Sequence, residues 1–338
     1  MLKFISTNNI LKDETQEKAL PFLEEWLNTQ KNFIYQQTSG STGNPKIISI
    51  AKRQLIASAR MTGDFFELST CTTALLCISP DYIGGKMMLV RALEYGLDVY
   101  TAPIVANPIA ELSVPIDFAA MVPIQVQTIL DQTPEKLNLI RYLIIGGAPV
   151  SKKLEEQIQQ YQCVAYSTFG MTETISHIAL QRLDNTNAPF IGIGKSHFSQ
   201  KNNCLIVSSP ELGIEELITN DAVELISPTS FRWKGRIDHV INTGGVKVFP
   251  ELIERKLSTT FDSVNFFIAA EQDDRLGQRV IAVILPGMID AESFKKKCYE
   301  LLDKYEQPKK LYVVEEFVYL ENNKLDRIKT FNSAKYSI

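Results

Sequence analysis

The segment Thr38-Ser39-Gly40-Ser41-Thr42-Gly43-Asn44-Pro45-Lys46 follows a strand-like apolar run, Phe33 to Gln37. It gathers hydroxyl side chains, two glycines and a lysine in a short stretch. Glycines let backbone N–H groups turn toward a bound oxyanion, hydroxyls add donors, and a lysine supplies positive charge. The segment therefore predicts a phosphate-binding loop. It lacks the Gly-Lys-Ser/Thr order of a Walker A loop, and taken alone it could equally be a flexible Ser/Gly turn.

On both sides of this loop, short apolar runs rich in β-branched residues alternate with longer stretches of helical period. This pattern is typical of sheets covered by helices and predicts an α/β fold. We expect an opening helix to bury Leu20, Leu23, Trp26 and Leu27, and Ser151 to cap a later helix. Further strands are expected at 74–78, 118–122, 142–145, 164–166 and 205–207.

The pattern changes after Trp233 to a compact block in which helical and strand-like runs are short and mixed. Such a block is typical of a small α+β domain. A short polar crossing, Gly235 to Asp238, separates it from the preceding apolar runs, as expected of a domain boundary. We predict a large N-terminal domain, residues 1–236, and a small mobile C-terminal domain, residues 237–338.

The composition excludes several classes of protein. The 338 residues suffice for two domains, and 45% hydrophobic with 22% charged residues is ordinary globular usage. A net charge of -4 offers no basic field for nucleic acid or an anionic membrane, so small-molecule ligands are the better expectation. Five cysteines without a CxxC pair predict buried thiols in a reducing compartment. Without a secretory leader or a membrane-spanning apolar run, we expect a cytoplasmic protein, and a homodimer is left open.

Five further motifs follow the loop in chain order. They are Gly146-Gly147-Ala148-Pro149, Tyr166-Ser167-Thr168-Phe169-Gly170-Met171-Thr172-Glu173, Asp221 in Ile218-Thr219-Asn220-Asp221, Trp233-Lys234-Gly235-Arg236-Ile237-Asp238 with Gly244-Gly245-Val246-Lys247-Val248-Phe249-Pro250-Glu251, and Asn323-Lys324-Leu325-Asp326-Arg327. The ordered set resembles the motifs of the adenylate-forming superfamily: acyl- and aryl-CoA synthetases, luciferases and the adenylation domains of peptide synthetases. Each motif alone is weak, but their common order across about residues 35 to 330 makes a chance match improbable.

The resemblance implies a two-step ligase. A carboxylate attacks the α-phosphate of ATP, pyrophosphate leaves, and the thiol of CoA then displaces AMP from the acyl-adenylate. Because charge builds on phosphate oxygens in the first step, fixed cations and Mg²⁺ aimed there lower the barrier. By resemblance, Lys324 reaches the α-phosphate, and Lys46 and Thr172 also take part in catalysis. Glu173 is implied as the Mg²⁺ ligand, since Mg²⁺ takes one or two carboxylates beside phosphate oxygens and water.

The same resemblance implies the remaining nucleotide and thiol contacts. Asp221 and Arg236 suit the ribose hydroxyls, Asp238 is the hinge, and Gly244 and Gly245 line the channel for CoA. The rest of the ATP-binding set is Thr38, Ser39, Gly40, Ser41, Thr42, Gly43, Lys46, Gly147, Ala148, Pro149, Ser167, Thr168, Phe169, Gly170, Met171 and Thr172.

Three departures from the family pattern stand out. Asn323 and Asn220 replace glycines that usually precede the catalytic lysine and the ribose aspartate, but asparagine also adopts the left-handed conformation. The phosphate loop begins at Thr38, whereas typical members carry a longer segment ahead of it. We therefore expect a member with a shortened N-terminal domain.

The stretch Pro80 to Met88 stands where the family often has a His-x-Gly-Gly segment beside the acid, with Tyr82 near the histidine's place and Gly84, Gly85 and Lys86 following. With the short N-terminus, this stretch resembles the short o-succinylbenzoate-CoA synthetases of menaquinone biosynthesis. Such an acid carries a second carboxylate and a ketone, which need a cation and donors. Nearby candidates are Lys86, Arg91, Ser176 and His177, each of which could also be structural.

Other interpretations remain open. The acid could be another aryl or acyl acid, and the thiol could belong to a carrier protein. The chain could also bind nucleotide without catalysis, which joint retention of Lys46, Glu173 and Lys324 disfavours. Glu173 and His177, at helical spacing, could hold a transition metal, although the chain has three histidines and no paired cysteines. The lysines 295–297, 304, 309 and 310 could meet the phosphates of CoA or form a solvated helix face.

Overall fold

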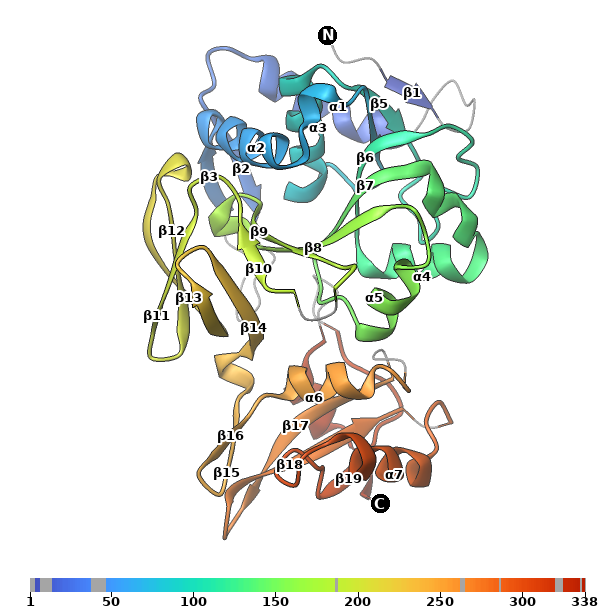
Figure 1. Cartoon of the computed structure of the whole chain (residues 1–338), viewed down its shortest axis with the longest axis vertical. Coiled ribbons are helices and arrows are strands. Elements are labelled where there is room, and N and C mark those ends of the chain that lie inside the picture. Colours follow the sequence, from blue (N-terminus) through green and yellow to red (C-terminus); the bar gives the residue numbers. More distant parts are fainter. Residues whose placement is uncertain are drawn as a thin grey trace.

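The computed structural model describes residues 4–6, 14–37, 47–185, 188–261, 265–285, 287–319, 325–334 and 336–337. Their elements form a large body and a small body stacked along the long axis of the molecule (Figure 1). The large body holds the described strands up to β14, and the small body holds those from β15 onward.

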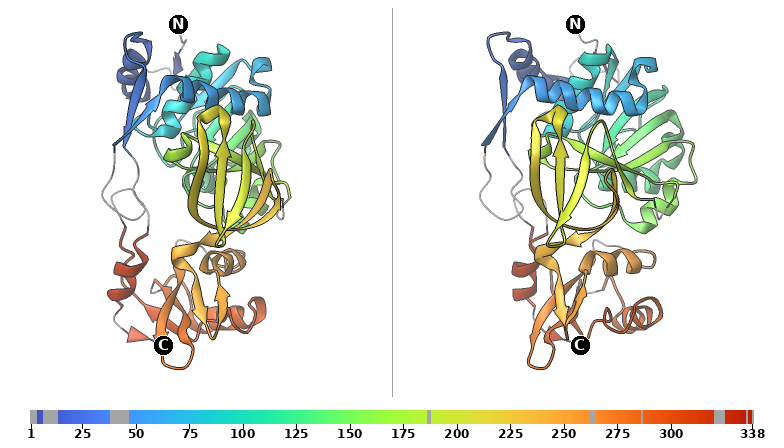
Figure 2. Two further views of the ribbon diagram at one scale, coloured as in Figure 1. Left: turned by 90° about the vertical axis from the view of Figure 1, so that its left-hand side faces the viewer. Right: turned by 60° about the vertical axis from the view of Figure 1, so that its left-hand side comes forward.

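The large body is built on a twelve-stranded sheet. Its spatial order is β1 (Phe4–Ser6), β5 (Asp98–Thr101), β4 (Thr73–Leu76), β6 (Ile116–Met121), β7 (Ile140–Ile145), β8 (Val164–Gly170), β9 (His177–Arg182), β10 (Phe190–Gly192), β14 (Ser230–Arg236), β13 (Ile214–Ser227), β12 (Cys204–Ser209) and β11 (His197–Lys201). Neighbours from β1 to β8 are parallel, and neighbours from β8 onward are antiparallel. Figure 2 shows the antiparallel end as a curved wall beside the helices.

Helices cover both faces of the parallel half, as a parallel sheet requires. One face packs against α1 (Glu14–Leu27), α2 (Lys52–Phe66) and α3 (Ile83–Tyr95), and the other against α4 (Pro123–Gln132) and α5 (Lys152–Ile158). Successive strand residues such as Leu75 and Leu76, or Ile144 and Ile145, enter opposite cores because side chains alternate along a strand. The predicted α/β fold is confirmed.

The remaining elements of the large body are short. A separate two-stranded sheet pairs β2 (Phe33–Gln37) with β3 (Ile47–Ala51) on either side of the predicted phosphate loop. Short 3₁₀ helices are η1 (Leu68–Thr70), η2 (Pro134–Leu139), η3 (Thr172–Thr174) and η4 (Pro210–Leu212), and a fifth, η5 (Ile237–His239), connects the large body to the small one.

The predicted buried face of α1 is partly wrong. Leu20 and Leu27 are 47% and 68% exposed, whereas Ala19 and Phe22 are buried and Trp26 packs beside them. The buried residues of the helix are Thr15, Ala19 and Phe22, and the Thr15 hydroxyl donates to the carbonyl of Ala102 at 2.7 Å. The buried face is therefore rotated away from Leu20 and Leu27, because the side of the helix that meets the core follows the helical spacing of Thr15, Ala19, Phe22 and Trp26.

The small body mixes parallel and antiparallel strands. Its sheet follows the order β16 (Val246–Val248), β15 (Ile241–Thr243), β18 (Gly277–Ile284), β19 (Lys310–Val313) and β20 (Tyr336–Ser337), with β17 (Phe266–Asp273) also on β18. The helices α6 (Pro250–Leu257) and α7 (Ala291–Leu301) pack on one face, and α8 (Arg327–Asn332) packs on the other. The predicted boundary at 236 and 237 falls between β14 and η5, and independent movement of the two parts stays a prediction.

Two further expectations concern the cysteines and the membrane. All five thiols are free, and four are buried, while Cys204 is half-buried. The expectation of buried, unpaired thiols is therefore confirmed for four of them. In the described ranges, no helix has the length and apolar character needed to cross a membrane.

Candidate active site

Two predicted motifs meet where β7 and β8 end. The carboxyl ends of parallel strands commonly form a ligand-binding edge. Gly146 follows β7 so closely beside β8 that a Cβ on it would lie 2.3 Å from Thr168 Oγ1, and Gly147 has a φ of +86°. The close approach favours glycine at 146 and the positive φ favours glycine at 147, and the two motifs meet where Gly146 lies beside Thr168. Ala148 and Pro149 are exposed at this edge, after which Ser151 caps α5 by accepting from the Leu154 N–H.

Glu173 stands out from the turn η3. The Thr174 hydroxyl accepts from the Met171 N–H at 2.9 Å and donates to the Ser176 carbonyl at 2.7 Å, which fixes the turn. Glu173 is exposed and has no hydrogen bond or ion pair with another described residue. Nowhere in the described ranges do three His, Cys, Asp or Glu side chains gather into a metal cluster. A single free carboxylate fits Mg²⁺ that is held mainly by phosphate oxygens and water.

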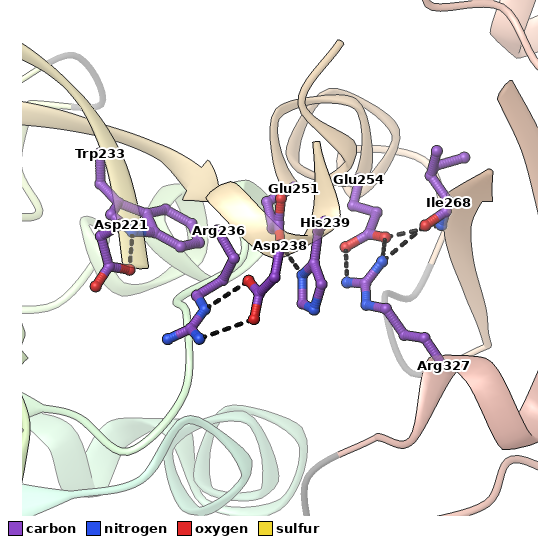
Figure 3. A network of polar contacts seen from close by, with 9 residues as sticks. All are labelled: Asp221, Trp233, Arg236, Asp238, His239, Glu251, Glu254, Ile268 and Arg327. Atoms are coloured by element: carbon purple, nitrogen blue, oxygen red, sulfur yellow. Dashed lines mark hydrogen bonds and ion pairs between the residues drawn. The ribbon is translucent and has the colours of Figure 1, made fainter. Parts of the chain in front are cut away.

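Asp221 and Arg236 lie opposite each other on β13 and β14. Trp233 Nε1 donates to Asp221 Oδ1 at 2.8 Å (Figure 3). Burial raises the pKa of Asp221, and the hydrogen bond from Trp233 and the charge of Arg236 partly oppose this effect. Arg236 in turn donates to both oxygens of Asp238 at 3.1 and 3.0 Å. The two predicted ribose residues are therefore adjacent, and Arg236 also ties the end of β14 to the predicted hinge residue.

Two more carboxylates of α6 continue this row of contacts into the small body. His239 Nδ1 lies 2.5 Å from Glu251 Oε1, and Arg327 donates to both oxygens of Glu254 at 2.6 and 2.8 Å (Figure 3). Arg327 also donates to the Ile268 carbonyl at 2.8 Å. The sequence identified Arg327 and Glu251 as parts of motifs, but it predicted neither the pairing of Arg327 with Glu254 nor that of His239 with Glu251.

The predicted acid-binding segment forms the start of α3. Tyr82 precedes the helix and is 63% exposed. A Cβ on Gly85 would lie 2.4 Å from the Ser79 carbonyl, so only glycine fits there, whereas Gly84 has room. Lys86 Nζ donates to Gln36 Oε1 at 2.7 Å, and burial lowers the pKa of Lys86 against the opposing charges of Glu25 and Asp81.

A buried polar chain connects α3 to β9. Arg91 Nη2 donates to Ser176 Oγ at 3.1 Å, and His177 Nε2 lies 3.1 Å from the hydroxyl of Thr62. Arg91 is 1% exposed, its Nε has no partner, and no carboxylate of the described residues pairs with it. Burial lowers the pKa of Arg91 to about 9. Thr62, in the C-terminal half of α2, belongs to no sequence motif and was missed.

The same contacts separate Glu173 from His177. The ring of His177 faces Thr62 through Nε2 and Ser176 through Nδ1, at 3.1 and 3.5 Å. Burial, followed by the charge of Arg91, lowers its pKa well below the usual value, so the ring is neutral. The structure therefore does not bring Glu173 and His177 together as a transition-metal pair.

Other predicted residues lie elsewhere. The turn formed by Gly244 and Gly245 is exposed and contacts Leu276, at the end of the small body far from the large one (Figure 1). Lys295 and Lys297 form ion pairs with Glu292 and Glu300, each one turn away within α7, as expected of a solvated helix face. The predicted phosphate loop, residues 38–46, and Lys324 lie outside the described residues.

Comparisons with known proteins agree with this fold and these motifs. Residues 3–204 match the model of the AMP-binding enzyme family. The crystal structure of an AMP-forming acyl-CoA synthetase/AMP-acid ligase II-like protein from Dyadobacter fermentans is 35% identical, with 95% of each chain covered and a TM-score of 0.61. The chain belongs to the AMP-binding enzyme family. It is therefore an AMP-forming ligase, as the motifs predicted.

Two relatives carry a more particular name. The 2-succinylbenzoate–CoA ligase of Bacillus mycoides is 24% identical over 347 residues, which cover 92% of this chain and 72% of that protein. The o-succinylbenzoate-CoA synthetase of Bacillus subtilis, solved with its acyl-adenylate, is 18% identical with a TM-score of 0.77, covering 89% of this chain and 70% of that one. At this identity the second likeness concerns the fold alone.

Proposed function

We propose that the protein activates 2-succinylbenzoate with ATP and transfers it to CoA, a step of menaquinone biosynthesis. The names of the relatives support this substrate, and the observation that carries it is the buried guanidinium of Arg91. An isolated buried cation is costly unless an anion compensates it. A substrate with a second carboxylate supplies that anion, and Ser176, already bonded to Arg91, adds a donor.

The first half-reaction places ATP at the edge formed by residues 147–149 and the end of β8. Asp221, with Arg236 opposite it, binds the ribose, and Lys46 and the loop that contains it hold the outer phosphates. Lys324 neutralises charge on the α-phosphate as the acid carboxylate attacks it. Mg²⁺ held by Glu173 would withdraw further charge from the phosphate oxygens. The neutral His177 keeps the Ser176 hydroxyl beside Arg91 and adds no competing positive charge.

The second half-reaction requires CoA to reach the acyl carbon, and we expect the turn of Gly244 and Gly245 to line its path. Absence of side chains there leaves room for the pantetheine arm. A carrier-protein thiol is the alternative acceptor. The cytoplasmic location and a homodimer stay predictions.

The test is ATP–pyrophosphate exchange across a panel of acids, followed by mass detection of the thioester. The panel pairs 2-succinylbenzoate with benzoate, which lacks the second carboxylate, and with succinate, which lacks the ring. We expect exchange with the first acid alone and a CoA thioester as product. Exchange that prefers benzoate would reject the role of Arg91, and a thioester formed only with a carrier protein would reject CoA.

A further inference from the structure

Two polar contacts join α5 of the large body to the end of α6 in the small body. Arg255 Nη2 lies 2.8 Å from both carboxylate oxygens of Glu155. The hydroxyl of Ser258 accepts from the backbone N–H of Lys152 at 3.2 Å. That N–H lies in the first turn of α5, where the helix itself offers no acceptor. We call these two contacts the α5–α6 clasp.

The carboxylate and the hydroxyl of the clasp are both buried. Glu155 is 2% exposed, and Ser258 is also buried. Burial raises the pKa of Glu155, and the charge of Arg255 opposes this effect. A buried carboxylate that loses its cation must regain water or a proton, so the clasp resists partial opening. The large and small bodies therefore either stay in contact or separate far enough for water to reach Glu155.

The elements of the clasp connect directly to the candidate site. Helix α5 begins just after the exposed turn of residues 147–149, which we assign to the nucleotide. Helix α6 also carries Glu254, which holds Arg327, three residues beyond Lys324 in the sequence. The clasp therefore fixes the nucleotide turn relative to the segment that follows the predicted catalytic lysine.

The clasp is incompatible with an arrangement in which the turn of Gly244 and Gly245 lines the path of CoA. With α6 held on α5, the turn of Gly244 and Gly245 lies at the far end of the small body (Figure 1). For that turn to line the thiol path, the small body must rotate, and Arg255 must leave Glu155. We propose that Glu155 and Arg255 are positioning residues for the adenylation half-reaction alone, and that their separation precedes thioester formation. The proposal rests on the two-step function proposed above.

The experiment measures the two half-reactions separately on the full-length protein. Adenylation is followed as pyrophosphate exchange with 2-succinylbenzoate, and thioester formation is started from supplied acyl-adenylate and CoA. The variants are Arg255→Gln and Glu155→Gln. Glu155→Gln removes the buried charge itself, so it still tests the proposal if Arg255→Gln folds poorly. Lys256→Gln is the matched control, because Lys256 neighbours Arg255 but pairs with Glu306 inside the small body.

We expect about a tenfold loss of exchange in both clasp variants, which corresponds to about 1.4 kcal/mol, with thioester formation unchanged or faster. The control should match the wild type in both reactions. Small-angle scattering should show a larger radius of gyration for the clasp variants. Equal losses in both half-reactions, or no loss in either, would overturn the proposal. A wild-type protein without exchange for any acid would instead reject the proposed function.

Discussion

Arg327 and Glu254 form a bidentate salt bridge inside the small body. The two guanidinium nitrogens lie 2.6 and 2.8 Å from the carboxylate oxygens, and one also donates to the Ile268 carbonyl. A bidentate salt bridge fixes the orientation of the arginine side chain as well as its position. Because Asp326 also caps α8 by accepting from the Lys329 N–H, the segment after Lys324 is held at its far end.

The first prediction concerns this anchor and Lys324. Lys324→Ala should lower ligase activity at least about 100-fold, as for a lost oxyanion donor, yet still convert supplied acyl-adenylate to thioester. Arg327→Lys keeps the charge but loses the bidentate geometry. It should reduce adenylation less than Lys324→Ala does, and it should likewise leave the conversion of supplied acyl-adenylate to thioester unchanged. Pyrophosphate exchange and thioester yield measure both effects.

Lys329→Ala is the control for the anchor, because Lys329 is an exposed residue of α8 whose contact with Asp326 is a weak surface pair. It should leave both half-reactions unchanged. If Lys324→Ala slows both half-reactions equally, its adenylation role is wrong.

The second prediction is that Arg91→Met weakens binding of the acid without lowering the stability of the protein. Methionine removes a buried charge and keeps a long apolar chain, so the free energy of unfolding should stay the same or rise. The KM for 2-succinylbenzoate should rise about 100-fold, since a charge-assisted hydrogen bond contributes about 1.5–3 kcal/mol. Denaturant unfolding and steady-state kinetics measure the two quantities, with the KM for ATP as control. A less stable protein with an unchanged KM for the acid would make Arg91 a structural residue.

The sequence predicted the α/β fold because strand and helix periods differ plainly, and it predicted the edge motifs because their glycines are required by close approach. Gly146 against Thr168 and Gly85 against Ser79 are such cases. It could not predict contacts between distant helices, such as Arg255 with Glu155, because neither residue stands in a motif. Thr62 was missed for the same reason, since a threonine in a helix carries no signal of its buried partner, His177.

The third prediction concerns Glu173. Glu173→Gln keeps the size of the side chain and removes its charge, and the exposed position means that stability should not change. We expect a higher Mg²⁺ concentration to be needed for half-maximal pyrophosphate exchange. Exchange rates across a Mg²⁺ titration provide the measurement, and thermal unfolding provides the control. Wild-type activity at limiting Mg²⁺ would reject the assignment.

The fourth prediction concerns thiol reactivity. Burial raises the pKa of Cys77, Cys163 and Cys298 to about 12, and burial also raises the pKa of Cys71, so few thiolates form at pH 8. Cys204 is the half-buried exception. A thiol-specific chromogenic disulfide should therefore modify one equivalent rapidly in the native protein and five after unfolding. Cys204→Ser should remove the rapid phase; two or more rapid equivalents would contradict the observed burial.

The last prediction concerns movement about the hinge. One site must first receive Lys324 and then admit a thiol to the same carbon, and a single rigid arrangement cannot easily do both. Asp238 lies in the short turn η5 between the bodies and is held by Arg236. Such a short connection can absorb the dihedral change of a domain rotation.

Asp238→Pro fixes φ near the value of a helical turn and removes a donor, so it should favour the arrangement described above. It should therefore slow thioester formation more than pyrophosphate exchange.

Gly245→Leu should also slow thioester formation more than pyrophosphate exchange, for a different reason. A side chain at this position, where φ is +83°, strains the turn and fills the path expected for the pantetheine arm. Gly287→Leu, at another exposed glycine with a positive φ of +72°, controls for backbone strain alone and should spare both half-reactions. Pyrophosphate exchange and thioester formation are measured on the same preparations. If Asp238→Pro and Gly245→Leu each slow the two half-reactions equally, the bodies do not alternate between two arrangements.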